Sequence, residues 1–191
     1  MRKILAFLFI ISMLSGCAYN PHMDDAFSDI PNFQQVNDQI YRGGRPSAGG
    51  VRQLKERGIK TVLSLRSDDS LTFAEKHLAK QCGLEFINIP LSVYKKPTDN
   101  QVLKFLDIVI DKSKQPIYIH CESGSDQTGA MIAAYRVIVE GWTIKEAYRE
   151  AKEFGFGYWP YHGNAELKRF IYQLGNKDIY FKRVGRQPPL P

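Results

Sequence analysis

Cysteine is scarce in this sequence, with three residues in a chain of 191. One lies near the amino terminus. The other two, Cys82 and Cys121, are too few for the disulfide framework of a small secreted domain. Cys82 falls at the end of an expected helix, where it is either a small buried apolar residue or a partner for Cys121. The chain therefore depends on its own hydrophobic core, and its length suits one domain.

Several other features are missing. No repeat or low-complexity tract is visible, no basic stripe is interleaved with aromatic residues, and no second pair of ligands has zinc-like spacing. These absences argue against a repeat array, a nucleic-acid partner and a metal site, and we expect no cofactor. Apolar residues make up 43% and charged residues 24%, as in an ordinary globular protein.

The amino terminus reads as a targeting segment. Arg2 and Lys3 precede an apolar run from Ile4 to Leu14 that is too short to span a bilayer comfortably. We therefore expect residues 1–16 to be a signal peptide and to lie outside the fold.

The end of this segment, Leu14-Ser15-Gly16-Cys17, resembles a bacterial lipobox, so that cleavage leaves Cys17 to be lipidated. A plain secretory signal with a chance cysteine is the alternative. Acyl chains on Cys17 would anchor the protein to a membrane, with residues 17–31 as a tether. Ala18 resembles lipoproteins sent to an outer membrane, so we expect a periplasmic location in the cell envelope. Cleavage removes Arg2 and Lys3 and lowers the net charge from +6 to +4, which suits an anionic substrate.

Strand and helix patterns alternate along most of the chain. Strands are predicted at residues 39–42 (as an edge strand), 60–65, 85–89 and 116–119. Helices are predicted at 48–58, 72–83, 98–110, 128–140, 143–151 and from 164 onward. Three pairs read as capping boxes: Thr72 with Glu75, Thr98 with Gln101, and Thr143 with Glu146. The predicted fold class is α/β, a central, mostly parallel sheet flanked by helices.

The most informative stretch runs from His120 to Gly129, between an expected strand and an expected helix. A glycine-containing loop of this kind aims backbone N–H groups and the positive end of the helix into one small space. Cys121 at its start would act there as a thiolate nucleophile. Thr128 could hydrogen-bond that thiolate, and His120 could brace the loop. The expected phosphate-binding groups are Glu122, Ser123, Gly124, Ser125 and Gln127.

The loop resembles the signature His-Cys-x5-Arg-Ser/Thr of cysteine-dependent protein-tyrosine and dual-specificity phosphatases. Further segments resemble the bacterial, exported branch of that superfamily: Ile40-Tyr41-Arg42 with Pro46, Val62 to Arg66, Ile89-Pro90, Ala134 to Trp142, and Phe154-Gly155-Phe156-Gly157. The resemblance covers roughly residues 36–175. It implies a dual-specificity-phosphatase-like domain over residues 32–180, a tail over 181–191, and hydrolysis of phosphate esters through a cysteinyl-phosphate intermediate.

Two positions depart from the pattern. The loop arginine of the family is Gln127 here, which retains an amide donor but no charge and no planar fork. The mobile loop that usually carries an aspartic acid, Leu91 to Pro97, has none. Asp99 is nearby but fits a capping position. Asp126 resembles the loop aspartate of lipid-phosphate-cleaving members and is the candidate acid, or else an exposed carboxylate balancing Lys95 or Lys96.

Two functions stay open at this point. One is a tyrosine or dual-specificity phosphatase slowed or altered by Gln127, acting on a phosphorylated protein or on a small or lipid-linked phosphate. The other is a pseudophosphatase that binds a phosphorylated or anionic ligand without turnover. A purely structural envelope lipoprotein gives no reason for the intact His120-Cys121 loop.

Overall fold

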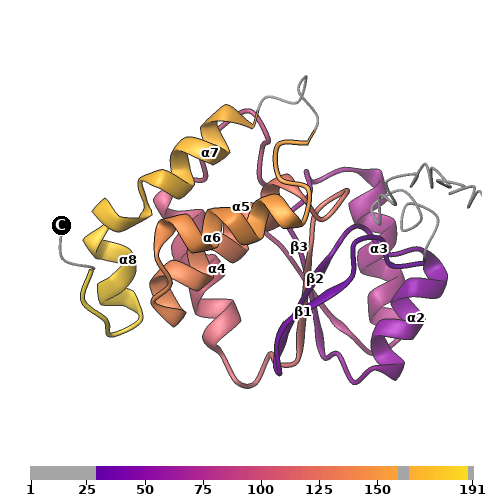
Figure 1. The fold of residues 1–191 in the computed structure, drawn as a ribbon. Helices are drawn as coiled ribbons and strands as arrows, with labels where there is room; N and C mark the ends of the chain where they lie inside the picture. The colour runs from indigo at the N-terminus through magenta and orange to yellow at the C-terminus, as the bar shows by residue number, and fades with distance from the viewer. Residues whose placement is uncertain (1–28, 159–163, 189–191) are drawn as a thin grey trace, which may run out of the picture.

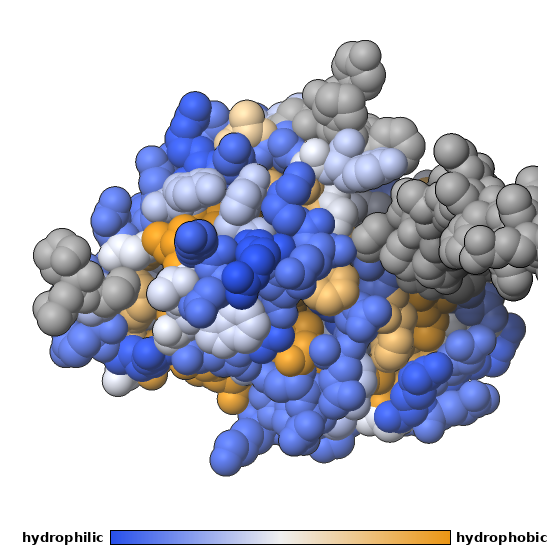
Figure 2. Space-filling model, in the orientation of Figure 1, coloured by the Kyte–Doolittle hydropathy of each residue, from blue (hydrophilic) through white to orange (hydrophobic). Residues whose placement is uncertain are grey.

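A computed structural model describes residues 29–158 and 164–188 of the chain (Figure 1). The expected signal peptide and the expected lipidation site at Cys17 lie outside the described residues, so both stay predictions. Within the described ranges, no helix is both long and apolar enough to cross a membrane. The face of the molecule in Figure 2 is mainly hydrophilic, with apolar side chains visible in small patches.

A mixed five-stranded sheet forms the centre, in the order β1-β2-β5-β3-β4. The strands are β1 (Gln34–Asn37), β2 (Ile40–Gly43), β3 (Thr61–Ser64), β4 (Glu85–Asn88) and β5 (Ile117–His120). All neighbours are parallel except β1, which pairs antiparallel with β2. The predicted α/β class is confirmed. The predicted edge position of residues 39–42 is wrong, because β1, which the sequence analysis missed, lies outside β2.

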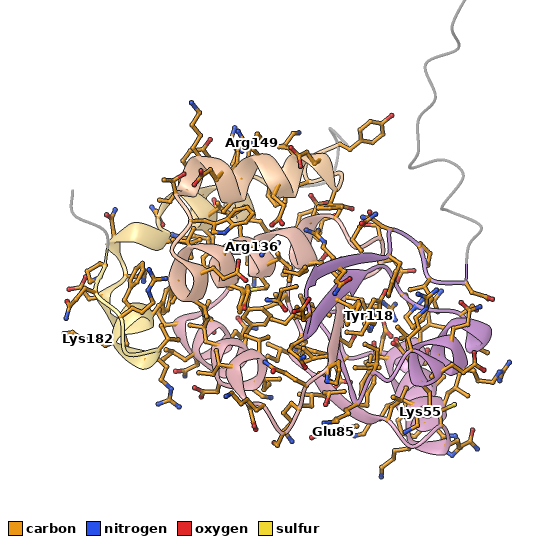
Figure 3. All side chains as sticks on the ribbon, turned by 60° about the horizontal axis from the view of Figure 1, so that its bottom comes forward. Lys55, Glu85, Tyr118, Arg136, Arg149 and Lys182 are labelled. Atoms are coloured by element: carbon orange, nitrogen blue, oxygen red, sulfur yellow. The ribbon has the colours of Figure 1, made fainter. Side chains whose placement is uncertain are left out.

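Helices cover both faces of this sheet (Figure 1). Helices α2 (Ala48–Glu56) and α3 (Ser70–Gln81) close a smaller core around Val62 and Tyr118. On the other face, α4 (Asp99–Ile110), α5 (Asp126–Tyr135) and α6 (Ile144–Glu153) close the larger core. Figure 3 shows Tyr118 among the strands, while Arg149 and Lys182 point outward. Cys82 is partly buried against the smaller core and is a free cysteine.

Two of the three predicted capping boxes are present in full, at Thr98 with Gln101 and at Thr143 with Glu146. The third is wrong. Helix α3 begins at Ser70, and Asp69 is its N-cap, accepting from the Thr72 backbone N–H at 2.9 Å. Its start lies further upstream because Asp69 is a suitable cap at that position. The position of Glu75 inside the helix leaves its carboxylate available for a contact with His120, the last residue of β5.

The final helices are α7 (Ala165–Tyr172), the short η3 (Leu174–Asn176) and α8 (Asp178–Arg183). Helix α8 crosses the predicted domain boundary at residue 180, and Phe181 is buried in the larger core. At the other end, residues placed in the tether also belong to the fold, since Ile30 is buried and the Asp29 side chain accepts from Gln53 at 2.9 Å.

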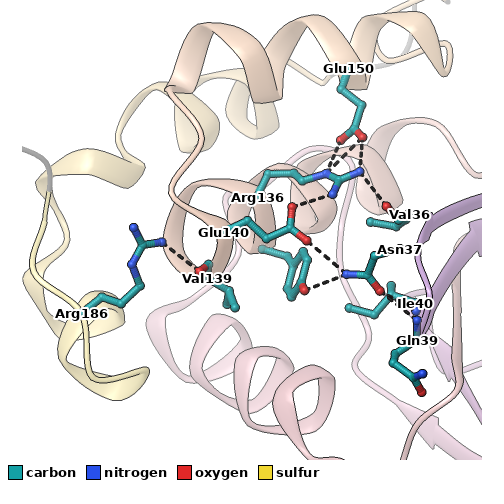
Figure 4. Close-up of polar contacts among 10 residues, drawn as sticks. Val36, Asn37, Gln39, Ile40, Arg136, Val139, Glu140, Glu150 and Arg186 are labelled. Carbon is teal, nitrogen blue, oxygen red and sulfur yellow. Dashed lines mark hydrogen bonds and ion pairs between the residues drawn. The ribbon is translucent and has the colours of Figure 1, made fainter.

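Helix α5 does not continue to residue 140 as a regular helix. After Tyr135 the chain adopts a π-helical turn, η2 (Arg136–Glu140), which ends at Gly141 with φ 81°. Arg136 is the centre of the network in Figure 4. Its guanidinium contacts Glu150 at 2.6 Å and Glu140 at 2.6 Å. It also donates to the Val36 carbonyl at 3.1 Å, which joins this turn to β1 and α6. Burial alone would lower the pKa of Arg136, but the hydrogen bonds to Glu150 and Glu140 outweigh burial and raise it.

Candidate active site

The site is built at the carboxyl end of the central strand β5. All four residues of β5 are buried, and the chain leaves the strand at His120 and enters α5 at Asp126. Within the described residues, the backbone N–H groups of Glu122 through Thr128 donate to no backbone oxygen, and the first such bond comes from Gly129 to Ser125 at 2.8 Å. Seven consecutive unpaired amides at a helix N-terminus form a cradle for an anion.

Gly124 fixes the curvature of this cradle. Its φ is +77°, and a Cβ at this position would lie 2.4 Å from the carbonyl carbon of Gly43. The Gly43-Gly44 turn therefore packs directly under the loop, and Arg45 N–H donates to the Glu122 carbonyl at 2.9 Å. Tyr118 Oη donates to the Gly44 carbonyl at 2.6 Å, which fixes the same turn from the sheet. Only glycine satisfies both the backbone angle and the close approach at Gly124.

The predicted nucleophile Cys121 and its predicted hydroxyl partner Thr128 flank the cradle in sequence, and no hydrogen bond joins them in this structure. Cys121 is 1% exposed, and Thr128 is fully buried. The Thr128 Oγ1 has no hydrogen-bond partner among the described residues. A buried hydroxyl without a partner destabilises the folded state by about 1–3 kcal/mol. The Thr128 hydroxyl is therefore a donor that a group bound in the loop could accept from. The two serines of the loop, Ser123 and Ser125, contact each other through Oγ atoms 2.5 Å apart.

His120, the last residue of β5, contacts the backbone at the start of the loop. Its Nδ1 lies 3.0 Å from the Cys121 carbonyl, and because a carbonyl only accepts, Nδ1 carries a proton. The opposite ring atom, Nε2, lies 2.8 Å from Oε1 of Glu75, with the two side chains 0% and 5% exposed. The two atoms are not aligned as a full hydrogen bond.

The Glu122 side chain points away from the cradle toward two arginines. Its Oε2 lies 2.6 Å from Arg66 Nε, and its Oε1 lies 3.4 Å from Arg45 Nε. The Glu122 carboxylate and the two guanidinium groups therefore neutralise one another at the rim of the site. Glu122 contributes its backbone N–H to the cradle, while its carboxylate occupies both nearby guanidinium groups.

Gln127, in the first turn of α5, lines an open pocket of about 380 Å³ together with Ser67, Asp68 and the segment from Pro90 to Tyr94. Two loops at the carboxyl ends of β3 and β4 thus face the loop after β5, which is where parallel sheets place ligands. The sequence analysis missed Asp68. It is exposed, and it is the one carboxylate among the described residues that line this pocket.

The other candidate acids are engaged elsewhere. The Asp126 carboxylate is 7% exposed, and its Oδ1 accepts from Gly157 N–H at 2.9 Å and from Asn164 Nδ2 at 3.1 Å. It therefore ties the start of α5 to the connection after α6, and its role as the acid stays a prediction. Asp99 lies in the first turn of α4, just inside the Thr98 cap, as expected. A hydrogen bond from Tyr180 and then one from Lys177 lower the pKa of Asp99, at distances of 2.5 and 3.0 Å.

Lys95 and Lys96, considered as charges that Asp126 could balance, are not among the residues that line the pocket. Lys96 Nζ donates to Gln173 Oε1 at 3.0 Å. Within the described ranges, no group of three or more His, Cys, Asp or Glu side chains could hold a metal ion.

Comparison of the chain with known proteins finds phosphatase relatives, as the geometry of the loop suggests. A family model named PTP-NADK, described as "DSP-PTPase phosphatase fused to NAD+ Kinase", matches residues 25–159. The probable NAD kinase 2 of Oryza sativa subsp. japonica is 33% identical over 121 residues, which cover 59% of this chain and 12% of that protein. The dual specificity protein phosphatase TpbA of Pseudomonas aeruginosa is 28% identical over 139 residues, covering 72% of this chain and 61% of TpbA. The chain therefore spans less than two thirds of either relative.

Solved structures show the same fold. TpbA of P. aeruginosa superimposes with a TM-score of 0.66 at 22% identity, over 81% of this chain and 91% of that chain. The core catalytic domain of the PP-IP phosphatase SIW14 from S. cerevisiae, solved with citrate, gives a TM-score of 0.66 at 24% identity, over 82% and 96%. A TpbA variant has been solved in complex with pTyr.

Proposed function

Since this chain belongs to the PTP-NADK family of DSP-PTPase phosphatases, we propose that it hydrolyses phosphate monoesters through a cysteinyl-phosphate intermediate at Cys121. The observation that carries the proposal is the cradle of unpaired amides from Glu122 to Thr128, which begins directly after Cys121. Such a cradle stabilises the equatorial oxygens of a phosphoryl group while it is transferred.

The reaction has two steps. The Cys121 thiolate attacks phosphorus, an S–P bond forms, and the ester P–O bond breaks as the leaving oxygen takes up a proton. Water then attacks phosphorus, the S–P bond breaks, and phosphate leaves with the thiolate restored. Thr128 Oγ1 is the buried donor available to stabilise that thiolate as it leaves. The loop amides hold the phosphoryl oxygens through both steps.

The leaving group favours an aryl ester. A phenol has a pKa of about 10 and departs with little help from an acid, whereas an aliphatic alcohol needs full protonation. The segment from Leu91 to Pro97 carries no acid, and Asp126 is bound to Gly157 and Asn164, which leaves the exposed Asp68 as the candidate acid. A phosphotyrosine-like ester is therefore the substrate class that this site handles best.

The pocket supports the same choice. It adjoins the cradle at Gln127, does not include Cys121, and offers Pro90, Leu91, Val93 and the ring of Tyr94 to an aryl group. The arginines at the rim of the site, Arg45 and Arg66, already pair with Glu122, so they are less available to the many negative charges of an inositol diphosphate. The two relatives TpbA and SIW14 are described as a dual specificity phosphatase and an inositol diphosphatase, so this lining favours the first kind of substrate.

The direct test is phosphate release by the purified full chain from a phosphotyrosine peptide and from an inositol pyrophosphate. We expect slow release from the peptide, little from the inositol compound, and none from the peptide with Cys121→Ser. Mass spectrometry of rapidly quenched wild type should find one phosphoryl group on the Cys121 peptide. Release that persists in Cys121→Ser, or a preference for the inositol compound, would refute the proposal.

Asp68 is the acid that we propose for esters with poor leaving groups, because it faces the pocket that Gln127 lines. Asp68→Asn should lower kcat/KM for an alkyl phosphate by about 10²-fold and leave an aryl phosphate nearly unchanged. Asp126→Asn is the matched control and should leave the rates for both esters nearly unchanged. If the two variants exchange these behaviours, Asp126 is the acid, as the sequence alone predicted.

A second candidate function is binding without turnover, and Gln127 is the observation that favours it. The cradle keeps its backbone amides. At the position where the family pattern has a charged arginine, this chain has the uncharged amide of Gln127. This candidate predicts that tungstate or phosphate raises the Tm of the wild type, while no phosphate release depends on Cys121. The hydrolysis assay with Cys121→Ser separates the two functions.

A further inference from the structure

Arg42 lies beneath the cradle and is absent from the set of site residues that the sequence predicted. It is 1% exposed in β2, and its Nη2 donates to the Gly124 carbonyl at 2.9 Å. Its guanidinium carbon lies 4.4 Å from the centre of the Phe154 ring, and a Cβ at Gly129 would lie 3.7 Å from Nη2. The guanidinium is therefore enclosed between the loop, the first turn of α5 and the segment after α6.

This environment is costly for a cation. Within the described residues, the Arg42 Nε and Nη1 atoms have no hydrogen-bond partner. Burial lowers the pKa of Arg42 to about 10, and the negative groups that oppose this effect are Glu150 and Cys121, with Tyr118 a smaller contributor. An unpaired buried charge costs several kcal/mol, so the fold needs a negative group close to this guanidinium.

Glu150 meets that need only in part. Both of its oxygens already accept from Arg136, whose own positive charge acts against Arg42. The next negative group that acts on Arg42 is Cys121, which follows directly after β5, the strand next to β2. Arg42 and Ile119 are paired in the register of β2 and β5, so Arg42 and Cys121 lie on the same face of the sheet.

We propose that Arg42 is a buried counter-cation for the Cys121 thiolate, and that it supplies from beneath the loop part of the positive charge that Gln127 lacks above it. The inference concerns the same loop as the proposed function. Arg42 does not touch the substrate, and it acts by keeping Cys121 ionised. It also binds the Gly124 carbonyl, which leaves the backbone N–H groups of the loop facing the phosphate site. The contact is reciprocal, since the thiolate in turn stabilises the buried guanidinium.

The test measures ionisation of Cys121 without any substrate. The full chain is treated with iodoacetamide over a range of pH, and alkylation of the Cys121 peptide is followed by mass spectrometry, which separates it from Cys17 and Cys82. Arg42→Met should raise the midpoint of the rate profile by about one pH unit, whereas Arg42→Lys should keep it near the wild-type midpoint. Arg57→Met is the matched control, since Arg57 lies over the Phe33 ring at 4.9 Å on the opposite side of the fold, and should leave the midpoint unchanged.

A folded Arg42→Met variant with the wild-type midpoint overturns the proposal. So does an Arg42→Lys variant that shifts as far as Arg42→Met, because the hydrogen bond to Gly124 would then be the cause. If Arg42→Met does not fold, the wild type is compared with Cys121→Ser by urea unfolding between about pH 5 and pH 8. The wild-type advantage should grow as pH rises, because the ionised thiol stabilises only the folded state. An advantage independent of pH overturns the proposal, whether or not the protein hydrolyses any phosphate.

Discussion

Replacing Gln127 by arginine should raise kcat/KM for an aryl phosphate by about 10²- to 10³-fold, which is the usual effect of one well-placed electrostatic stabiliser. Gln127 is partly buried in the first turn of α5, at the edge of the open pocket, so a longer side chain can extend toward the phosphoryl oxygens. A guanidinium then adds a planar pair of charged donors to the amides from Glu122 to Thr128, which are already in place.

The comparison uses two controls. Gln127→Lys adds the charge without the planar fork and should recover only part of the gain. Gln81→Arg adds the same charge at the exposed end of α3 and should change nothing. All rates should vanish in the double variant Gln127→Arg with Cys121→Ser. A Gln127→Arg protein that binds phosphate no better and turns over no faster than wild type would show that the cradle is not arranged for phosphoryl transfer.

The cradle itself could be predicted because its determinants are local. A strand, a glycine at the sharpest bend, and a helix that begins within a few residues are all visible in the stretch around Cys121 and Gly124. The capping boxes at Thr98 and Thr143 were found for the same reason, since each involves residues three apart. Likewise Gly58, expected to end a helix, follows α2 with φ +80°.

The supporting groups could not be predicted in this way. Thr72 and Glu75 have the spacing of a capping box, but the contact between Glu75 and His120 across the fold determines where that carboxylate lies. Arg42 reads as a polar position on a strand, and only the packing of Phe154 and Gly124 around it shows that it is buried. Asp68 becomes a site residue only when the loops after β3, β4 and β5 come together.

Glu75 carries the largest expected effect on stability. Glu75→Leu should lower the free energy of unfolding by about 3 kcal/mol, because it removes one member of a buried pair and leaves the His120 ring without its neighbouring carboxylate. Glu75→Gln should cost less, since its amide N–H can donate to Nε2 while His120 Nδ1 still donates to the Cys121 carbonyl. The loss of Glu75 should also disturb the loop, because the carbonyl that His120 contacts is that of Cys121, the proposed nucleophile.

Glu85→Leu provides the matched control for this variant. Glu85 also contacts a basic side chain, Lys114 at 2.6 Å, but the two side chains are 44% and 30% exposed. Its removal should therefore cost less than about 1 kcal/mol. Urea unfolding at neutral pH measures all three variants, and a double-mutant cycle with His120→Leu isolates the pair itself. If Glu75→Leu is no less stable than Glu85→Leu, the contact does not support the loop, and His120 must be held by its stacking on Tyr118 at 5.6 Å.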